Sequence, residues 1–147
     1  MRYTLKNVTK NIEAWSDKDP VRSELSVEFR TKAGREVFGL IGEDGEYKAF
    51  MCVAYTTDVP KNIVSMGALT SVDGDIAVPY TVWSYQRGAG KEIINQALSL
   101  MQERNISRVV TLSPLTQMAK QFHLRNDAIE LQVNDTTANF EYLLKSI

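Results

Sequence analysis

The sequence predicts an α/β (α+β) fold in which helices flank a central mixed sheet. Segments with strand-like patterns alternate with segments of helical period along the chain. Residues 47–56 are apolar on both alternating sets of positions, as in a central strand whose two faces are both covered. With 147 residues, 44% of them apolar, the chain has the length of one domain with a full core. We therefore expect a single domain over residues 1–147, in which residues 1–18 are weakly patterned.

The first expected helix begins at Asp19 and Pro20. Asp19 suits an N-cap and Pro20 suits the first helical position. An apolar stripe at i, i+4 and i+8 follows: Val21, Leu25 and Phe29. Gly34 then provides a stop signal. The sequence therefore predicts one helix over most of residues 20–33.

The later elements are expected at positions set by period and turn residues. Strands are predicted at 35–41, 47–56, 76–84, 107–112 and 128–133. Helices are predicted at 63–69, from the turn 86–90 to about 104, and at 114–124. The pattern of 138–144 leaves its secondary structure undecided. Pro79 interrupts the strand at 76–84. Because proline cannot donate to a ladder, it marks an edge, a bulge or a place where two strands part.

Composition excludes several kinds of partner. The 17 basic and 18 acidic residues are mixed and give a net charge of −1, so nucleic acid is not expected. Apolar runs are short and the N-terminus has no signal-peptide core, so we expect no membrane. The lone Cys52, among apolar neighbours, fits a buried inert thiol in a reducing compartment, and a cytoplasmic protein is expected. One histidine and scattered carboxylates predict no metal site.

The turn between the strand at 76–84 and the next helix is a candidate binding site. Glycines let the backbone approach a ligand, and a helix N-terminus offers N–H groups to an anion such as a pyrophosphate. The ligand-binding residues expected here are Gln86, Arg87, Gly88, Ala89, Gly90 and Lys91. Glycines between a strand and a helix often serve only the turn, and without further context this alternative is slightly ahead.

Arg87-x-x-Gly90 after a proline-interrupted strand resembles the acetyl-CoA-binding motif of the GNAT superfamily, which grips CoA where two parallel strands splay apart. Glu92 stands where most GNAT acyltransferases have a small residue. Six segments, in order, resemble the catalytic domain of malonyl-CoA decarboxylase, a branch with the GNAT fold. They are Arg35–Gly39, Cys52–Tyr55 with Val59–Ile63, Pro79–Val82, Thr111–Pro114, Phe122–Asn126 and Ala138–Tyr142.

The resemblance implies a GNAT-like domain with splayed parallel strands and an acyl-CoA substrate. It implies decarboxylation of malonyl-CoA to acetyl-CoA through a thioester enolate, with no cofactor beyond the CoA thioester. Active-site roles are implied for five residues: Thr81, Glu92, Ser113, His123 and Tyr142. Ser113 and His123 are expected to face one cleft beside the glycine turn. A homo-oligomer stays one alternative for the assembly.

Each of these residues also has an ordinary structural alternative. The Ser113 hydroxyl can cap a helix, and His123 can be a satisfied histidine on an amphipathic helix. Glu92 suits the first turn of a helix, where the dipole favours an acid. Tyr142 can be a core aromatic, and Thr81 is a good strand former.

Two other functions stay open. One is a GNAT N-acyltransferase that moves an acetyl group to an amine. The other is a CoA- or acyl-binding module without catalysis. The five retained polar positions count against the binding module, because a pure binder needs only the phosphate turn.

Overall fold

An eight-stranded mixed sheet forms the centre of the structure, a computed structural model that describes residues 2–144. Its strand order is β1-β2-β3-β4-β5-β8-β6, and β7 pairs with β8. The strands are β1 (Tyr3–Asn7), β2 (Arg35–Gly42), β3 (Tyr47–Thr56), β4 (Ile76–Ser84), β5 (Arg108–Val110), β6 (Ser113–Pro114), β7 (Ile129–Val133) and β8 (Thr137–Tyr142). The helices are η1 (Ile12–Ala14), α1 (Val27–Thr31), α2 (Ile63–Leu69), α3 (Ala89–Glu103) and α4 (Gln117–Arg125).

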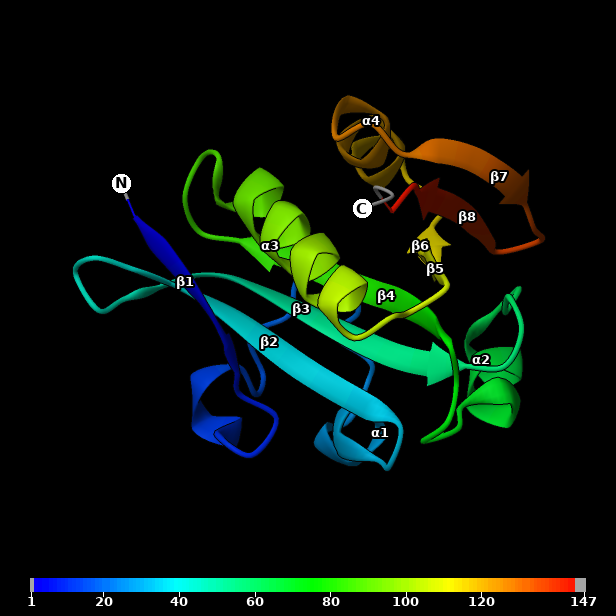
Figure 1. Ribbon diagram of the computed structural model, residues 1–147, viewed down its shortest axis with the longest axis horizontal. Helices are drawn as coiled ribbons and strands as arrows, with labels where there is room; N and C mark the ends of the chain where they lie inside the picture. The colour runs from blue at the N-terminus through cyan, green and yellow to red at the C-terminus, as the bar shows by residue number, and fades with distance from the viewer. Residues whose placement is uncertain (1, 145–147) are drawn as a thin grey trace.

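Helices cover both faces of the strands β2 to β4. Figure 1 shows α3 lying across one face, with α1 on the other side of the sheet. Alternate β3 residues supply the two cores: Met51 packs on the α3 side, whereas Cys52 packs with Trp15 and with Met66 of α2. Helix α4 packs against β6 and β7, beyond the α3-covered strands. The predicted α/β class and the doubly covered central strand are confirmed.

Strands β4 and β5 run parallel at the centre of the sheet and then part. Their ladder pairs Ile76 with Arg108 and Ala77 with Val109. One further bond follows, from Leu112 N to the Pro79 carbonyl at 3.0 Å. On the other edge of β4, the register with β3 shifts immediately after Pro79. Pro79 thus marks both a bulge and the parting of two strands, as its lost N–H predicts.

Arg22 fills the gap that opens beyond Pro79. Its Nε donates to the Tyr80 carbonyl at 2.7 Å, and its Nη2 donates to the Leu112 carbonyl at 2.8 Å. These carbonyls lie on β4 and after β5, so one guanidinium joins the two separated strands. Arg22 is buried, and its two bonds satisfy carbonyls that the interrupted ladder leaves without N–H partners.

The prediction of a helix beginning at Asp19 and Pro20 is wrong. Helix α1 starts at Val27, where the Ser26 side chain accepts from Phe29 N at 3.0 Å. Asp19 does accept the backbone N–H groups of Val21 and Arg22 through Oδ1. However, the Arg22 carbonyl accepts from Leu25 N at 3.1 Å, a turn bond between residues three apart, and from Arg30 Nη2 at 2.8 Å, so the segment forms a turn and no α-helix.

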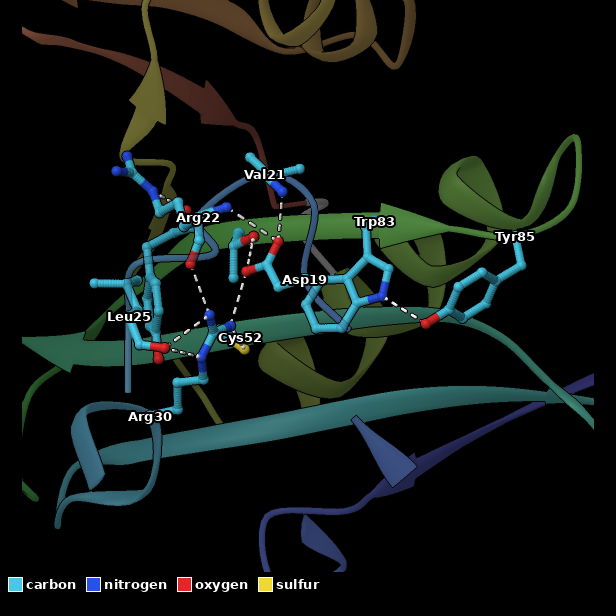
Figure 2. A network of polar contacts seen from close by, with 10 residues as sticks. Asp19, Val21, Arg22, Leu25, Arg30, Cys52, Trp83 and Tyr85 are labelled. Atoms are coloured by element: carbon cyan, nitrogen blue, oxygen red, sulfur yellow. Dashed lines mark hydrogen bonds and ion pairs between the residues drawn. The ribbon is translucent and has the colours of Figure 1, made fainter. Parts of the chain in front are cut away.

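The buried ion pair between Asp19 and Arg30 fixes this irregular segment. Arg30 Nη1 donates to Asp19 Oδ2 at 2.8 Å, and their side chains are only 5% and 2% exposed. Figure 2 shows the carboxylate between the Arg30 guanidinium and the backbone of Val21. Arg30 Nη1 also lies 3.6 Å from Cys52 Sγ. Burial raises the pKa of the Cys52 thiol to about 12, which confirms the expected buried, inert cysteine.

Several element ends differ from the prediction for local reasons. The helix expected from Pro114 begins at Gln117, because the Thr116 side chain accepts from Ala119 N. Ser113, in β6, pairs with Ala138 of β8, so it does not cap that helix.

The weakly patterned start of the chain contains β1 and η1. Trp15, in the same segment, is buried and donates to the Val8 carbonyl. Within residues 2–144, no helix combines the length and the apolar character needed to cross a bilayer.

We expect Arg30→Met to destabilise the fold by about 3–5 kcal/mol, because it leaves the Asp19 carboxylate buried without its cation. Urea unfolding at neutral pH measures this change. Lys120→Met removes the exposed pair with Glu130 and should cost less than about 1 kcal/mol. Equal losses in the two variants would contradict the dependence of this segment on the buried ion pair.

Candidate active site

Two adjoining pockets lie where β4 and β5 part. The inner pocket, of about 360 Å³, lies between β4, β6, α4 and residues 20–21. The outer pocket, of about 580 Å³, lies beside the turn that precedes α3. Four residues line both pockets and form the neck between them: Ser84, Gly90, Phe122 and Arg125. A long ligand that lies against the turn can therefore extend into the inner pocket.

The glycine turn has the two geometries that glycine allows. Gly88 has φ of +87° at the N-cap of α3, in the left-handed region that other residues occupy at a cost. Gly90 lies under α4, where an added Cβ would come within 2.8 Å of Phe122 Cε1. The first glycine therefore shapes the turn, whereas the second allows α4 to close over it.

The outer pocket is positively charged. Arg87 and Lys91 line it from the turn, and Arg125 lines it from α4. None of these three cations takes part in an ion pair within the described residues, and no carboxylate is among the lining residues. Together with the N–H groups at the start of α3, they form a suitable site for an anion.

Most of the residues predicted for ligand binding do line the outer pocket. They are Gln86, Arg87, Gly88, Gly90 and Lys91. Gln86 also donates to the Tyr3 hydroxyl at 2.9 Å, which ties the turn to β1. Ala89 lies apart, buried in the core on the α3 side of the sheet.

Ser113 and His123 line the same inner pocket, although they come from different elements. Ser113 lies in β6, which pairs with β8. His123 lies near the end of α4, stacked on Phe140 of β8 at a centroid distance of 5.3 Å. The structure therefore brings together the hydroxyl and the imidazole that the sequence predicted to share one cleft.

Tyr142 holds the His123 ring through a hydrogen bond. The Tyr142 hydroxyl lies 2.7 Å from His123 Nδ1. Burial raises the pKa of Tyr142, so this side chain is a phenol at neutral pH. Within residues 2–144 the hydroxyl has no hydrogen-bond partner besides Nδ1, so we assign the phenol as donor and Nδ1 as acceptor. This assignment puts the ring proton of His123 on Nε2.

The His123 imidazole is neutral under ordinary conditions. Burial lowers the pKa of His123 from 6.5 to about 4, because the charged ring loses its hydration. No group within residues 2–144 makes a hydrogen bond to Nε2. Because His123 lines the inner pocket, Nε2–H remains for a bound molecule. His123 is therefore a neutral hydrogen-bond donor at this site.

Among the described residues, the Ser113 hydroxyl has one side-chain partner, Thr111. Their oxygens are 2.8 Å apart, and either hydroxyl can donate. Thr111 also accepts from Phe140 N at 3.1 Å, which fixes its side chain against β8. When Thr111 donates to Ser113, the Ser113 hydrogen is free to point toward a ligand. Thr111 was not predicted as a site residue, although it belongs to the same motif.

Thr81 and Glu92 differ from the expected arrangement. Thr81 lines the inner pocket, but its hydroxyl donates to Asp19 Oδ2 at 2.8 Å. Its proton is therefore not available to a ligand. Glu92 lines neither pocket. Its carboxylate accepts from Gln96 at 2.9 Å, and Gln96 in turn bonds to the backbone of β1. The structure does not bring Glu92 together with Ser113 and His123.

Sequence reasoning missed three residues that shape the site. Asp19 and Arg22 hold the segment that lines one end of the inner pocket, and the cap signal at Asp19 hid this role. Arg125 lies in the segment Phe122–Asn126, two residues after His123, and lines both pockets. Nothing in the local sequence distinguishes it from an ordinary exposed cation on a helix.

A mixed sheet whose central parallel strands part beside a glycine turn, with helices on both faces, defines a GNAT-like fold. Solved structures agree. The malonyl-CoA decarboxylase of Agrobacterium vitis matches 81% of this chain with a TM-score of 0.59 and 20% identity. The malonyl-CoA decarboxylase of Rhodopseudomonas palustris matches 85% with a TM-score of 0.62 and 22% identity. This chain spans about a third of each decarboxylase, 35% and 36% of their lengths.

An acetyltransferase structure has the same fold. The PaiA N-acetyltransferase of Thermoplasma acidophilum, solved in complex with coenzyme A, matches 96% of this chain and 98% of its own. Its TM-score is 0.65 at 9% identity. No protein-family model and no curated protein sequence matches the chain. At these identities the solved structures establish the fold, and the activity has to be argued from the site.

The low pKa of His123 predicts an acid-sensitive fold. Its folded pKa of about 4 lies below the unfolded value of 6.5, so protons bind preferentially to the unfolded chain. The stabilisation is complete above pH 6.5 and is lost as the pH falls toward 4. We expect the free energy of unfolding to drop by about 2 kcal/mol more between pH 7 and pH 5 in the wild type than in His123→Gln. Parallel urea titrations of the two proteins measure this difference, and identical pH dependence would contradict a buried neutral imidazole.

Proposed function

We propose that this protein binds an acyl-CoA thioester and decarboxylates it, with malonyl-CoA as the substrate. The diphosphate would lie in the outer pocket, at the N-terminus of α3 and beside Arg87, Lys91 and Arg125. The acyl end would extend through the neck into the inner pocket. The observation that carries this proposal is the shared lining of the inner pocket by Ser113 and His123, directly adjoining a cationic turn.

The charge of the site supports an anionic substrate over an amine acceptor. Among the described residues, neither pocket is lined by Asp or Glu. An amine acceptor is a cation at neutral pH before it reacts, and acidic residues would favour its approach. Malonyl-CoA carries an additional carboxylate. Arg125, the one Lys or Arg among the described residues that line the inner pocket, would attract it.

Decarboxylation requires a group that stabilises the thioester enolate. As the C–C bond to the carboxylate breaks, its electron pair moves toward the thioester oxygen. His123 Nε2–H can donate to that oxygen, and the Ser113 hydroxyl can donate to the same oxygen or orient the departing carboxylate. Donors that are fixed before the reaction and aimed at developing charge are commonly the largest contribution to such catalysis.

The Tyr142–His123 pair can then supply the proton that the carbon needs. Nε2–H passes to the enolate carbon while the Tyr142 proton passes to Nδ1. The ring stays neutral, and the resulting tyrosinate regains a proton from solvent. The net reaction consumes one proton and releases carbon dioxide and acetyl-CoA. Apart from this solvent proton, the proposed step uses only the thioester and these side chains.

A GNAT N-acyltransferase is the second candidate. The observation that favours it is the match with the PaiA N-acetyltransferase over nearly the whole of both chains. In that reaction the neutral His123 would accept a proton from an attacking amine, which requires Nε2 to lose its hydrogen first. The hydrogen bond from Tyr142 favours the opposite tautomer.

We expect purified wild-type protein to release carbon dioxide from malonyl-CoA without an amine acceptor. Ser113→Ala and His123→Ala should each lower turnover by about 10²–10³, because each removes a donor to the enolate. Both should retain CoA affinity within a few-fold, measured by calorimetry, because neither residue lines the outer pocket. Ser99→Ala, at an exposed position of α3, is the matched control.

Three results would separate the candidates. Carbon dioxide release that depends on Ser113 and His123 supports the decarboxylase. Consumption of acetyl-CoA only when amines are added supports the acyltransferase. CoA binding without either reaction supports a binding module and rejects both enzymes.

A further inference from the structure

We propose that residues 19–22, here named the strap, limit the length of the acyl group and that Val21 determines this specificity. The inference rests on the proposed binding of an acyl-CoA. Pro20 and Val21 line the inner pocket. Val21 is 39% exposed, and it is one of the apolar side chains that a ligand in this pocket would contact.

The strap lies at the end of the inner pocket that is distant from the glycine turn. Strand β4 connects the two ends: Ser84 is in the neck, and Thr81 binds Asp19 of the strap. Three residues of extended strand span roughly 10 Å. Strap residues line the inner pocket but not the outer one. A thioester anchored at the turn would therefore point its acyl end toward Pro20 and Val21.

The strap is held as a fixed wall. Asp19 accepts four hydrogen bonds: two from the backbone of the strap, one from Arg30 and one from Thr81. Arg22 bonds to the carbonyls of Tyr80 and Leu112. Figure 2 shows the Asp19 carboxylate joined to the Arg30 guanidinium and to the backbone of Val21 and Arg22. Moving the strap would break bonds to two buried charged groups, which costs far more than a side-chain rotation.

A fixed apolar wall favours short acyl groups. The thiol arm of CoA and the acyl group would share the inner pocket of about 360 Å³, which the strap closes at one end. Each additional methylene that meets Val21 would have to displace the strap. The site therefore selects acyl groups of two or three carbons, because longer chains cannot be accommodated by flexible side chains alone.

The test compares binding of CoA, acetyl-CoA and butyryl-CoA, by calorimetry, in the wild type, Val21→Ala and Val21→Ile. Val21→Ala removes two methyl groups from the wall and should raise the affinity for butyryl-CoA relative to acetyl-CoA by about tenfold. Val21→Ile should lower the affinity for acetyl-CoA but not for CoA, because CoA carries no acyl group. Val64→Ala, whose residue is 83% exposed on α2, should behave as the wild type.

The outcomes distinguish this inference from the function on which it rests. If CoA binds and the butyryl-to-acetyl ratio is unchanged in both Val21 variants, the strap does not set acyl length. If CoA does not bind to the wild type, the proposed function fails and this inference fails with it. A raised ratio in Val21→Ala together with unchanged CoA affinity supports the strap as the specificity wall.

Discussion

The parting of β4 and β5 is the constraint on which the rest of this structure depends. Two parallel strands that separate inside a protein leave carbonyl groups without N–H partners, and an unsatisfied buried carbonyl is costly. Arg22 satisfies one carbonyl on each side of the gap. A guanidinium in such a position has to be held by its own segment, and the Asp19–Arg30 pair does this. The pockets exist because the gap can stay open on one side while Arg22 joins its edges.

Strand β8 organises the chemical groups beside that gap. It pairs with β6, which fixes Ser113, and its last residue, Tyr142, bonds to the His123 ring. The same strand supplies Phe140, whose ring stacks on the imidazole. One short strand thus positions a hydroxyl and an imidazole that lie ten residues apart in sequence on two different elements. Rigid support of this kind suits a site that must aim donors before a reaction begins.

Local sequence patterns predicted the elements whose form is set by neighbouring residues along the chain. Residues 47–56 are apolar on both faces and form the doubly covered β3, and Pro79 marks the bulge and the parting of strands. Asp19 was misinterpreted because an N-cap and a buried ion-pair partner begin with the same local bonds to the next N–H groups. Its distant partners, Arg30 and Thr81, decide between the two roles, and no local pattern contains them.

The candidate site, like the fold, was predictable only in part. The resemblance to the decarboxylase segments implied that Ser113 and His123 would face one cleft, and both line the inner pocket. The orientation of Glu92 was not predictable. Its carboxylate is held by Gln96, and Gln96 is held in turn by the backbone of β1, which is far away in sequence. Tyr142 combines two alternatives that the sequence kept apart, since it is both a buried aromatic and a partner of the imidazole.

The buried Cys52 gives this molecule an internal reporter. Its sulfur lies 3.6 Å from Nη1 of Arg30, in the ion pair that anchors residues 19–22, and burial raises the pKa of the thiol to about 12. Alkylating reagents attack thiolates, so the folded chain should be inert toward them. The rate at which such a reagent labels Cys52 therefore measures how often the region around the Asp19–Arg30 ion pair opens.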